Sequence, residues 1–281
     1  MKKILLTSPK GYAQRLIQAF AEVTEQTDIC PVSIPMIQTD ILPDSEGMKE
    51  FLSQLSAYDY LAFSSRKAIE SLADAIQSTG ITLPTCLQLC AIGKDNEGVR
   101  EMLHREPAFI SEEPSPAGIV KHLSTLPSIE GKRIGVLAPV VTGMKEPDIV
   151  PNFLEGLNRI GMKTDRITAY QTKACATETL NRLRTEILNE DYHSVLFTSG
   201  TEIKVFLRMA AEGCQASPSA TMEEMPDTES IHHLLKHLQV HCYGPYTASV
   251  ATQLGIAVDF VSPSFGSFQE LVSELQKYEN K

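Results

Sequence analysis

Short apolar segments alternate with amphipathic segments along most of the chain. Residues 60–63 form an apolar run typical of a buried strand, and residues 68–78 carry apolar side chains at the helical period. The same order recurs at 194–197 and 202–211. Strands that alternate with helices in this way predict an open parallel sheet flanked by helices, with ligands bound beyond the carboxyl ends of its strands.

The turn between strand and helix also recurs. Ser64 and Ser65 follow the first of these strands, and Thr198-Ser199-Gly200 follow the second. Hydroxyl side chains at such junctions cap the helix, while the free N–H groups of the first helical turn favour anions. The two turns therefore indicate either a pair of carboxylate or phosphate sites or simply two capped helices.

A second internal repeat relates residues 89–99 to residues 240–250, and in it Asn96 matches Thr247. Each half of the chain thus contains two strand-to-helix turns. The repeat predicts two related domains whose four turns present amides and small polar side chains to a large polyanion.

Two long extended segments, residues 28–42 and 162–172, interrupt the alternation. Pro31 and Pro35 lie in the first segment and favour an edge strand or a linker. We expect the chain to leave a first domain, build a second and return. The predicted boundaries are 1–35 plus 173–281 for a discontinuous first α/β domain, and 36–172 for the second, which includes the connector strands.

Two further local patterns predict less regular structure. Apolar residues at 109–110 predict one more short strand. Residues 212–228 are rich in Ser, Pro and acidic side chains and predict a mobile surface loop.

The composition is that of a globular protein. The chain has 281 residues, and 42% of them are hydrophobic, which suffices for two domains with their own cores. A formal charge of −10, with no Lys/Arg run longer than two, argues against a nucleic-acid partner. No segment approaches about 20 consecutive apolar residues, and no signal-peptide pattern precedes the first strand. We therefore expect a cytoplasmic monomer without a membrane span.

The sequence contains no recognisable metal or nucleotide motif. Its six cysteines are scattered without a C-x-x-C pair. His233 and His237 are four residues apart, but no carboxylate or cysteine stands at a supporting spacing, so we expect His232, His233, His237 and His241 to form a solvated helix face rather than a metal site. A GxGxxG motif, a Walker-type phosphate loop and a Gly-x-Ser-x-Gly elbow are all absent.

The ordered set of segments resembles the uroporphyrinogen-III synthase family over nearly the whole chain. The resemblance rests on residues 61–69, 91–93, 169–172, 195–200, 242–248, 254–258 and 267–272. It implies two doubly wound, flavodoxin-like α/β domains with parallel sheets, joined by a two-stranded connector, and an enzyme without a cofactor. The family closes the linear tetrapyrrole hydroxymethylbilane into uroporphyrinogen III, with loss of water and inversion of the last pyrrole ring. Because the free substrate cyclises by itself to the uninverted isomer, positioning is the larger part of the catalytic task.

The resemblance also implies roles for individual residues. Tyr170 matches the family's tyrosine after the second extended segment and would donate a proton or hydrogen bond to the leaving hydroxyl, because a phenol with a pKa near 10 stays protonated at neutral pH. A tyrosine packed between domains is the alternative. Substrate carboxylates would be bound by Ser64, Ser65, Arg66, Asn96, Thr198, Ser199, Gly200, Tyr246 and Thr247. Thr247 could equally serve only as a helix cap, and Arg66 and Lys67 could simply be solvated.

Several positions depart from the family pattern. Lys10 follows Pro9 where members commonly have an arginine before the proline, and residues 138–146 lack the usual arginine-glycine character. Asn96 replaces a common threonine, and Glu97 adds a negative charge that would oppose a carboxylate. These departures leave a second hypothesis open, a synthase-like protein that binds a tetrapyrrole or another polyanion in an interdomain cleft without turnover.

Overall fold

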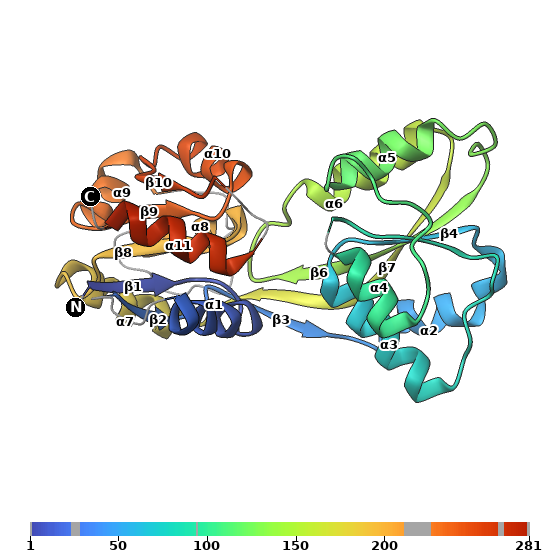
Figure 1. Ribbon diagram of the computed structural model, residues 1–281, viewed down its shortest axis with the longest axis horizontal. Helices are drawn as coiled ribbons and strands as arrows, with labels where there is room; N and C mark the ends of the chain where they lie inside the picture. Colours follow the sequence, from blue (N-terminus) through green and yellow to red (C-terminus); the bar gives the residue numbers. More distant parts are fainter. Residues whose placement is uncertain (1, 24–28, 94, 211–225, 264–266, 280–281) are drawn as a thin grey trace. The chain divides into compact units, whose positions relative to one another are not determined.

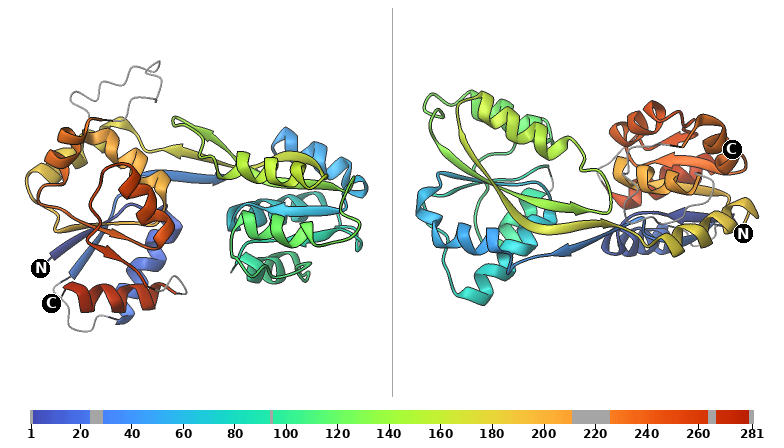
Figure 2. Two further views of the ribbon diagram at one scale, coloured as in Figure 1. Left: turned by 90° about the horizontal axis from the view of Figure 1, so that it is seen from above. Right: turned by 180° about the vertical axis from the view of Figure 1, so that it is seen from behind.

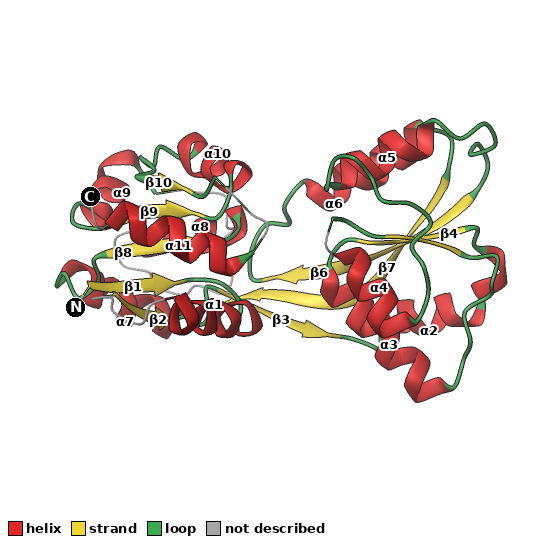
Figure 3. Ribbon diagram, in the orientation of Figure 1, coloured by secondary structure: helices red, strands yellow, loops and turns green. Residues whose placement is uncertain are grey.

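The computed structural model describes residues 2–23, 29–93, 95–210, 226–263 and 267–279 (Figure 1). The chain forms two compact units. Unit 1 comprises Met1–Gln38, Gly143–Lys145 and Lys173–Lys281, and unit 2 comprises Thr39–Thr142 and Glu146–Thr172. Each unit contains one five-stranded sheet with helices on its faces (Figures 2 and 3).

The sheet of unit 1 has the strand order β10-β9-β8-β1-β2, and all its pairs are parallel. Counted along the unit, this order is 2-1-3-4-5, the doubly wound arrangement of flavodoxin-like folds. The strands are β1 (Lys2–Leu6), β2 (Ile29–Ser33), β8 (Ser194–Phe197), β9 (Gln239–Cys242) and β10 (Phe260–Val261). The helices are α1 (Lys10–Val23), α7 (Thr177–Leu188), α8 (Gly200–Leu207), the 3-10 turn η2 (Arg208–Ala210), α9 (Thr228–Leu235), α10 (Pro245–Gln253) and α11 (Phe268–Glu279).

Alternate side chains of the central strands point to two cores in unit 1. Ile4 and Leu6 of β1 pack with α1 and α11, whereas Leu5 packs with α7, α8 and α9 on the opposite face. This two-residue alternation is what a pleated strand covered on both faces requires.

The sheet of unit 2 has the order β3-β7-β6-β4-β5, with β4 parallel to both neighbours. Its edge strand β3 runs antiparallel to β7, because Met36 bonds Cys175 while Leu42 bonds Ala169. The strands are β3 (Ile37–Ile41), β4 (Tyr60–Phe63), β5 (Gln88–Cys90), β6 (Arg133–Thr142) and β7 (Lys163–Ala174). The helices are α2 (Glu46–Ser53), the 3-10 turn η1 (Leu55–Ala57), α3 (Arg66–Thr79), α4 (Asp95–Leu103), α5 (Pro116–Ser124) and α6 (Ile149–Arg159).

The predicted fold class is confirmed, with local corrections. The extended segment 28–42 forms two edge strands, and Pro31 lies in β2 at the edge of its sheet, where a missing N–H is tolerated. The strand expected at 109–110 is wrong: Ile110 is 63% exposed, and the Phe109 ring stacks on His122. Most of the loop predicted at 212–228 lies outside the described residues. Among the described residues, no helix is both long and apolar enough to cross a membrane.

The end of α11 is held to the amino ends of the strands by a buried carboxylate. Glu279 accepts hydrogen bonds from Lys2 Nζ at 2.9 Å, His193 Nε2 at 3.0 Å and His241 Nε2 at 3.1 Å. Of the four histidines expected on a solvated helix face, His241 is therefore misassigned: it is fully buried in β9. Burial by itself would raise the pKa of Glu279, but the bonds from His241 and Lys2 and the charge of His193 outweigh it and lower the pKa to about 2.

Glu279→Gln is expected to flatten the acid limb of the stability profile. Because the folded pKa of about 2 lies below the usual 4.5, Glu279 contributes stability above pH 4.5 and loses it as the pH falls toward 2. Urea unfolding at a series of pH values should show the variant less stable at pH 7, with a smaller loss between pH 4.5 and 2. Glu274→Gln is the control and should keep the wild-type profile, because Glu274 lies on the same helix and, within the described part of the chain, pairs with Lys277 alone. An unchanged profile for Glu279→Gln would contradict the assignment.

Candidate functional site

Ser64 and Tyr170 meet just beyond the carboxyl end of β4 in unit 2. The N–H and hydroxyl of Ser64 both bond the carbonyl of Leu137, at 3.1 and 2.8 Å. The Ser64 hydroxyl lies 3.2 Å from the Tyr170 hydroxyl. Because a serine hydroxyl has a single hydrogen, and that of Ser64 points to Leu137, the phenol is the donor in this pair.

The Tyr170 phenol is enclosed by the core of unit 2. Tyr170 lies on β7 and is 7% exposed. Burial raises the pKa of Tyr170 above its ordinary value, and the hydroxyls of Ser64 and Ser65 oppose the shift. The phenol therefore stays protonated at neutral pH and can act as a hydrogen-bond donor.

The remaining predicted residues of this turn have different surroundings. Ser65 is the N-cap residue of α3, but its side chain does not cap the helix, and its buried oxygen has no hydrogen-bond partner among the described residues. Arg66 forms an ion pair of 2.9 Å with Glu101, and Lys67 pairs with Glu70. Both bases are partly exposed, and such surface pairs are weak, so Arg66 can exchange Glu101 for a ligand carboxylate at little cost.

Asn96 is buried at the start of α4, with 2% exposure. Its Nδ2 donates to the carbonyl of Gly93 at 2.7 Å, which fixes the orientation of the amide. The Oδ1 atom receives no hydrogen bond from any residue that the structure describes. The first turn of this helix also carries Asp95 and Glu97. The unpaired atom of Asn96 is thus an acceptor in acidic surroundings.

In unit 1 the turn after β8 is organised around Glu202, which is 1% exposed. Its Oε2 lies 2.8 Å from Thr7 Oγ1 and 2.9 Å from the N–H of Thr198. Its Oε1 accepts from Thr198 Oγ1 at 2.6 Å and from Ser199 Oγ at 3.0 Å. The hydroxyls expected to bind a substrate carboxylate are therefore already engaged by a carboxyl group of the chain.

Sequence reasoning missed Glu202, although a local signal was present. Ser199 accepts from the Glu202 N–H as the N-cap of α8, and the two residues have the S-x-x-E spacing of a capping box. Thr7, by contrast, is 195 residues away, and its contact follows only from the pairing of β1 with β8.

The turn after β9 is tied to the turn after β8. Thr247 is buried, and its hydroxyl donates to the Thr198 carbonyl at 3.3 Å. Tyr246 precedes it at the start of α10 and is 63% exposed. Of the two residues predicted to bind substrate in the turn after β9, Thr247 thus bonds the neighbouring turn, whereas Tyr246 presents its ring to solvent.

Gly200→Ala is expected to destabilise unit 1. A Cβ at this position would lie 2.9 Å from Cγ1 of Val250, because the Val250 side chain already fills the space between α8 and α10. Overpacking of this kind costs about 1–3 kcal/mol. Gly11→Ala, in α1 with nothing within 4 Å of the added atom, is the control and should be neutral or stabilising. Chemical unfolding of both variants measures the effect, and equal stabilities would refute the packing argument.

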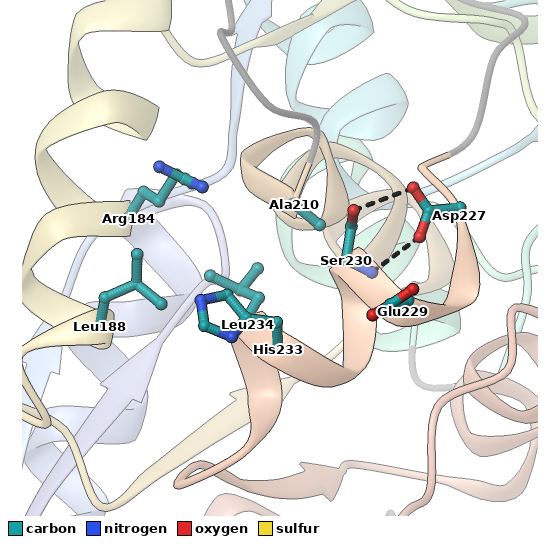
Figure 4. A pocket seen from close by; sticks show the side chains of 8 residues that line it. All are labelled: Arg184, Leu188, Ala210, Asp227, Glu229, Ser230, His233 and Leu234. Atoms are coloured by element: carbon teal, nitrogen blue, oxygen red, sulfur yellow. Dashed lines mark hydrogen bonds between the residues drawn. The ribbon is translucent and has the colours of Figure 1, made fainter.

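The pocket in Figure 4 lies apart from these turns. It has a volume of about 490 Å³ and is lined by Arg184, Leu188, Ala210, Asp227, Glu229, Ser230, His233 and Leu234. The N-terminus of α9 beside it is already capped by the Asp227 carboxylate. Within the described ranges, no group of three or more His, Cys, Asp or Glu side chains is arranged to hold a metal ion.

Comparisons with known proteins agree with this architecture. The family model described as "Uroporphyrinogen-III synthase HemD" matches residues 18–222. A mutant uroporphyrinogen III synthase of Thermus thermophilus is similar over 100% of this chain and 99% of its own, with 13% identity and a TM-score of 0.69. The wild-type enzyme from that organism, in another crystal form, is similar over 100% of this chain and 98% of its own, with 13% identity and a TM-score of 0.52. No curated protein sequence matches the chain. The family match spans well over half of the chain, and the chain belongs to the uroporphyrinogen-III synthase family.

Proposed function

We propose that this protein is a cofactor-free uroporphyrinogen-III synthase, which closes hydroxymethylbilane to uroporphyrinogen III with loss of water and inversion of the last pyrrole ring. Family membership supports the reaction class. The observation that carries the proposal is the buried Tyr170 phenol, which donates to Ser64 just beyond the carboxyl end of β4. This edge is where doubly wound sheets bind their ligands.

Tyr170 is proposed to redirect its hydrogen bond from Ser64 to the leaving hydroxyl of the substrate. The phenol gives its proton to that oxygen as the C–O bond breaks, so the oxygen leaves as water. The pyrrole nitrogen supplies the electron pair to the exocyclic carbon, and the proton that this nitrogen then loses restores the phenol. The raised pKa of the phenol disfavours a persistent phenolate. Its proposed contribution is therefore general acid assistance, typically about 10²–10⁴-fold, added to the positioning of the rings.

The polar groups of the two units are proposed to bind the substrate in different ways. In unit 2, Ser65 and Arg66 would contact carboxylates, whereas the Asn96 Oδ1 suits an N–H donor such as a pyrrole. Ser64, whose N–H and hydroxyl both bond the Leu137 carbonyl, would hold the Tyr170 phenol in place. In unit 1, Glu202 engages the hydroxyls of Thr198 and Ser199. We therefore assign carboxylate contacts there to the backbone N–H of Gly200 and to the exposed Tyr246, with Thr247 holding the turn.

The second candidate is a family member that binds a tetrapyrrole without turnover. The acidic first turn of α4 and the self-engaged hydroxyls of unit 1 favour it. The experiment that separates the two measures the isomer ratio formed when purified protein meets freshly generated hydroxymethylbilane. Predominant isomer III supports the synthase. Isomer I alone, at the rate of a control without protein, refutes the enzyme, and retained binding of the product would then support the second candidate.

A further inference from the structure

A cluster of aromatic rings and one arginine lies at the carboxyl end of the unit 1 sheet. Tyr12 and Arg15 lie in the first turns of α1, which follows β1. Phe268 begins α11, and Tyr243 directly follows β9. Because both helices begin, and β9 ends, at the same edge of a parallel sheet, side chains from three segments distant in sequence come together there.

The ring geometry centres on Phe268. Its ring centroid lies 5.8 Å from that of Tyr12, at an interplanar angle of 70°, and 5.5 Å from that of Tyr243, at 46°. The guanidinium carbon of Arg15 lies 4.6 Å from the Tyr12 centroid and 5.0 Å from the Phe268 centroid. The cation is therefore held by two ring faces, an arrangement that stabilises a guanidinium by electrostatic attraction.

Arg15 is exposed and forms no ion pair with a carboxylate of the described residues. Glu270 is an acidic group near the cluster, close enough to act on Tyr243 electrostatically. Burial raises the pKa of the Tyr243 phenol, and the charge of Glu270 raises it further, whereas the charge of Arg15 lowers it. An arginine held by rings keeps its planar edge of N–H donors available, and that edge matches a carboxylate with two parallel hydrogen bonds. Tyr12 is 43% exposed beside it.

We propose that Arg15 binds a carboxylate of the tetrapyrrole while the Tyr12 ring contacts the face of the pyrrole that bears it. The inference rests on the proposed function and adds a substrate contact outside the strand-to-helix turns. The chemistry of the cluster selects the ligand class, a planar ring with an acidic substituent. In a chain with a formal charge of −10, such a local cation offsets the unfavourable overall field for an anionic substrate.

The test compares Arg15→Ala, Arg15→Lys and Tyr12→Leu with a matched surface control, Arg159→Ala. Arg159 is exposed on α6 of unit 2, and among the described residues it pairs with Glu155 alone. Its replacement by alanine removes the same charge as Arg15→Ala. The probe is uroporphyrin, the fluorescent oxidised product, whose anisotropy reports binding. Arg15→Ala is expected to weaken binding about tenfold, Arg15→Lys and Tyr12→Leu less, and Arg159→Ala hardly at all. Equal affinities of Arg15→Ala and Arg159→Ala would overturn the proposal.

Kinetics separate this proposal from the proposed function. If wild-type protein forms isomer III, Arg15→Ala should raise KM about tenfold with kcat within about twofold, since the lost contact binds a remote part of the substrate. An unchanged KM in an active wild-type background refutes the Arg15 site alone. If the wild type forms no isomer III but Arg15→Ala still weakens uroporphyrin binding relative to Arg159→Ala, the enzyme proposal fails and the binding site stands. Circular dichroism and urea unfolding check that all variants are folded.

Discussion

Tyr170→Phe is expected to lower the rate of isomer III formation by about 10²–10⁴-fold while the protein stays folded. The substitution removes only the hydroxyl, whose donor bond goes to Ser64 at 3.2 Å. The ring remains in the core of unit 2, where it packs with side chains of β4 and α3. Since the free substrate continues to cyclise by itself, the product of the variant should shift from isomer III toward isomer I.

The measurement is the isomer ratio as a function of enzyme concentration, together with uroporphyrin affinity and urea unfolding. Tyr60→Phe serves as the control because it removes a phenol from the opposite end of β4. That variant should keep the wild-type ratio. If Tyr170→Phe also keeps it, the hydroxyl has no part in the chemistry. If binding and stability fall together with the rate, Tyr170 is a packing residue.

Glu202→Leu is expected to destabilise unit 1 by about 3–5 kcal/mol. The carboxyl group is fully buried and bonds Thr7, the N–H and hydroxyl of Thr198, and Ser199. Leucine is similar in size but leaves the donors of Thr198 and Ser199 without this partner. Each orphaned buried group costs about 1–3 kcal/mol, although such costs are not fully additive. Glu202→Gln keeps an acceptor and should lose much less. Urea unfolding followed by circular dichroism measures both, and similar stabilities for the two variants would contradict this account.

The pH dependence of the stability difference between wild type and Glu202→Gln tests the protonation of Glu202. Burial is the main influence and raises the pKa of Glu202 above 4.5, although its hydrogen bonds oppose the shift. A raised folded pKa means that the carboxyl contributes most stability below its unfolded pKa and loses that contribution as the pH rises. The Thr7 hydroxyl has one hydrogen but lies 3.0 Å from the Leu196 carbonyl and 2.8 Å from Glu202 Oε2, so it can donate to only one of them. Both contacts are hydrogen bonds only when Glu202 carries a proton and donates it to the Thr7 oxygen. The stability gap between wild type and Glu202→Gln should therefore narrow as the pH rises above about 4.5.

The alternation of strands and helices was predictable from the sequence because it depends on local periodicity. A strand covered on both faces is a short apolar run, and a surface helix repeats its apolar positions every three to four residues. The Pro31 segment was predicted to be an edge strand or a linker for a reason equally local, the missing N–H of proline. The false strand at 109–110 shows the limit: two apolar residues satisfy the pattern, but in the structure Phe109 stacks on His122 instead.

Tyr170 and Ser64 were named from the sequence through the family resemblance, and the structure adds that they form a hydrogen-bonded pair across 106 residues. Proximity of this kind has no local signature. It arises because β4, β6 and β7 are neighbours in one sheet, which brings residues far apart in the chain side by side.

The sequence by itself determined the fold class, since the hydrophobic period of each segment selects strand or helix without reference to distant residues. The tertiary structure alone decided which polar groups are available. Thr198 and Ser199 have the composition of an anion site, yet packing places the Glu202 carboxyl on them. Arg15 has no local motif, yet packing of α11 against α1 places its guanidinium on Phe268. Hydrogen bonds and ring contacts depend on distances of a few ångströms between elements, and those distances are set by the packed fold.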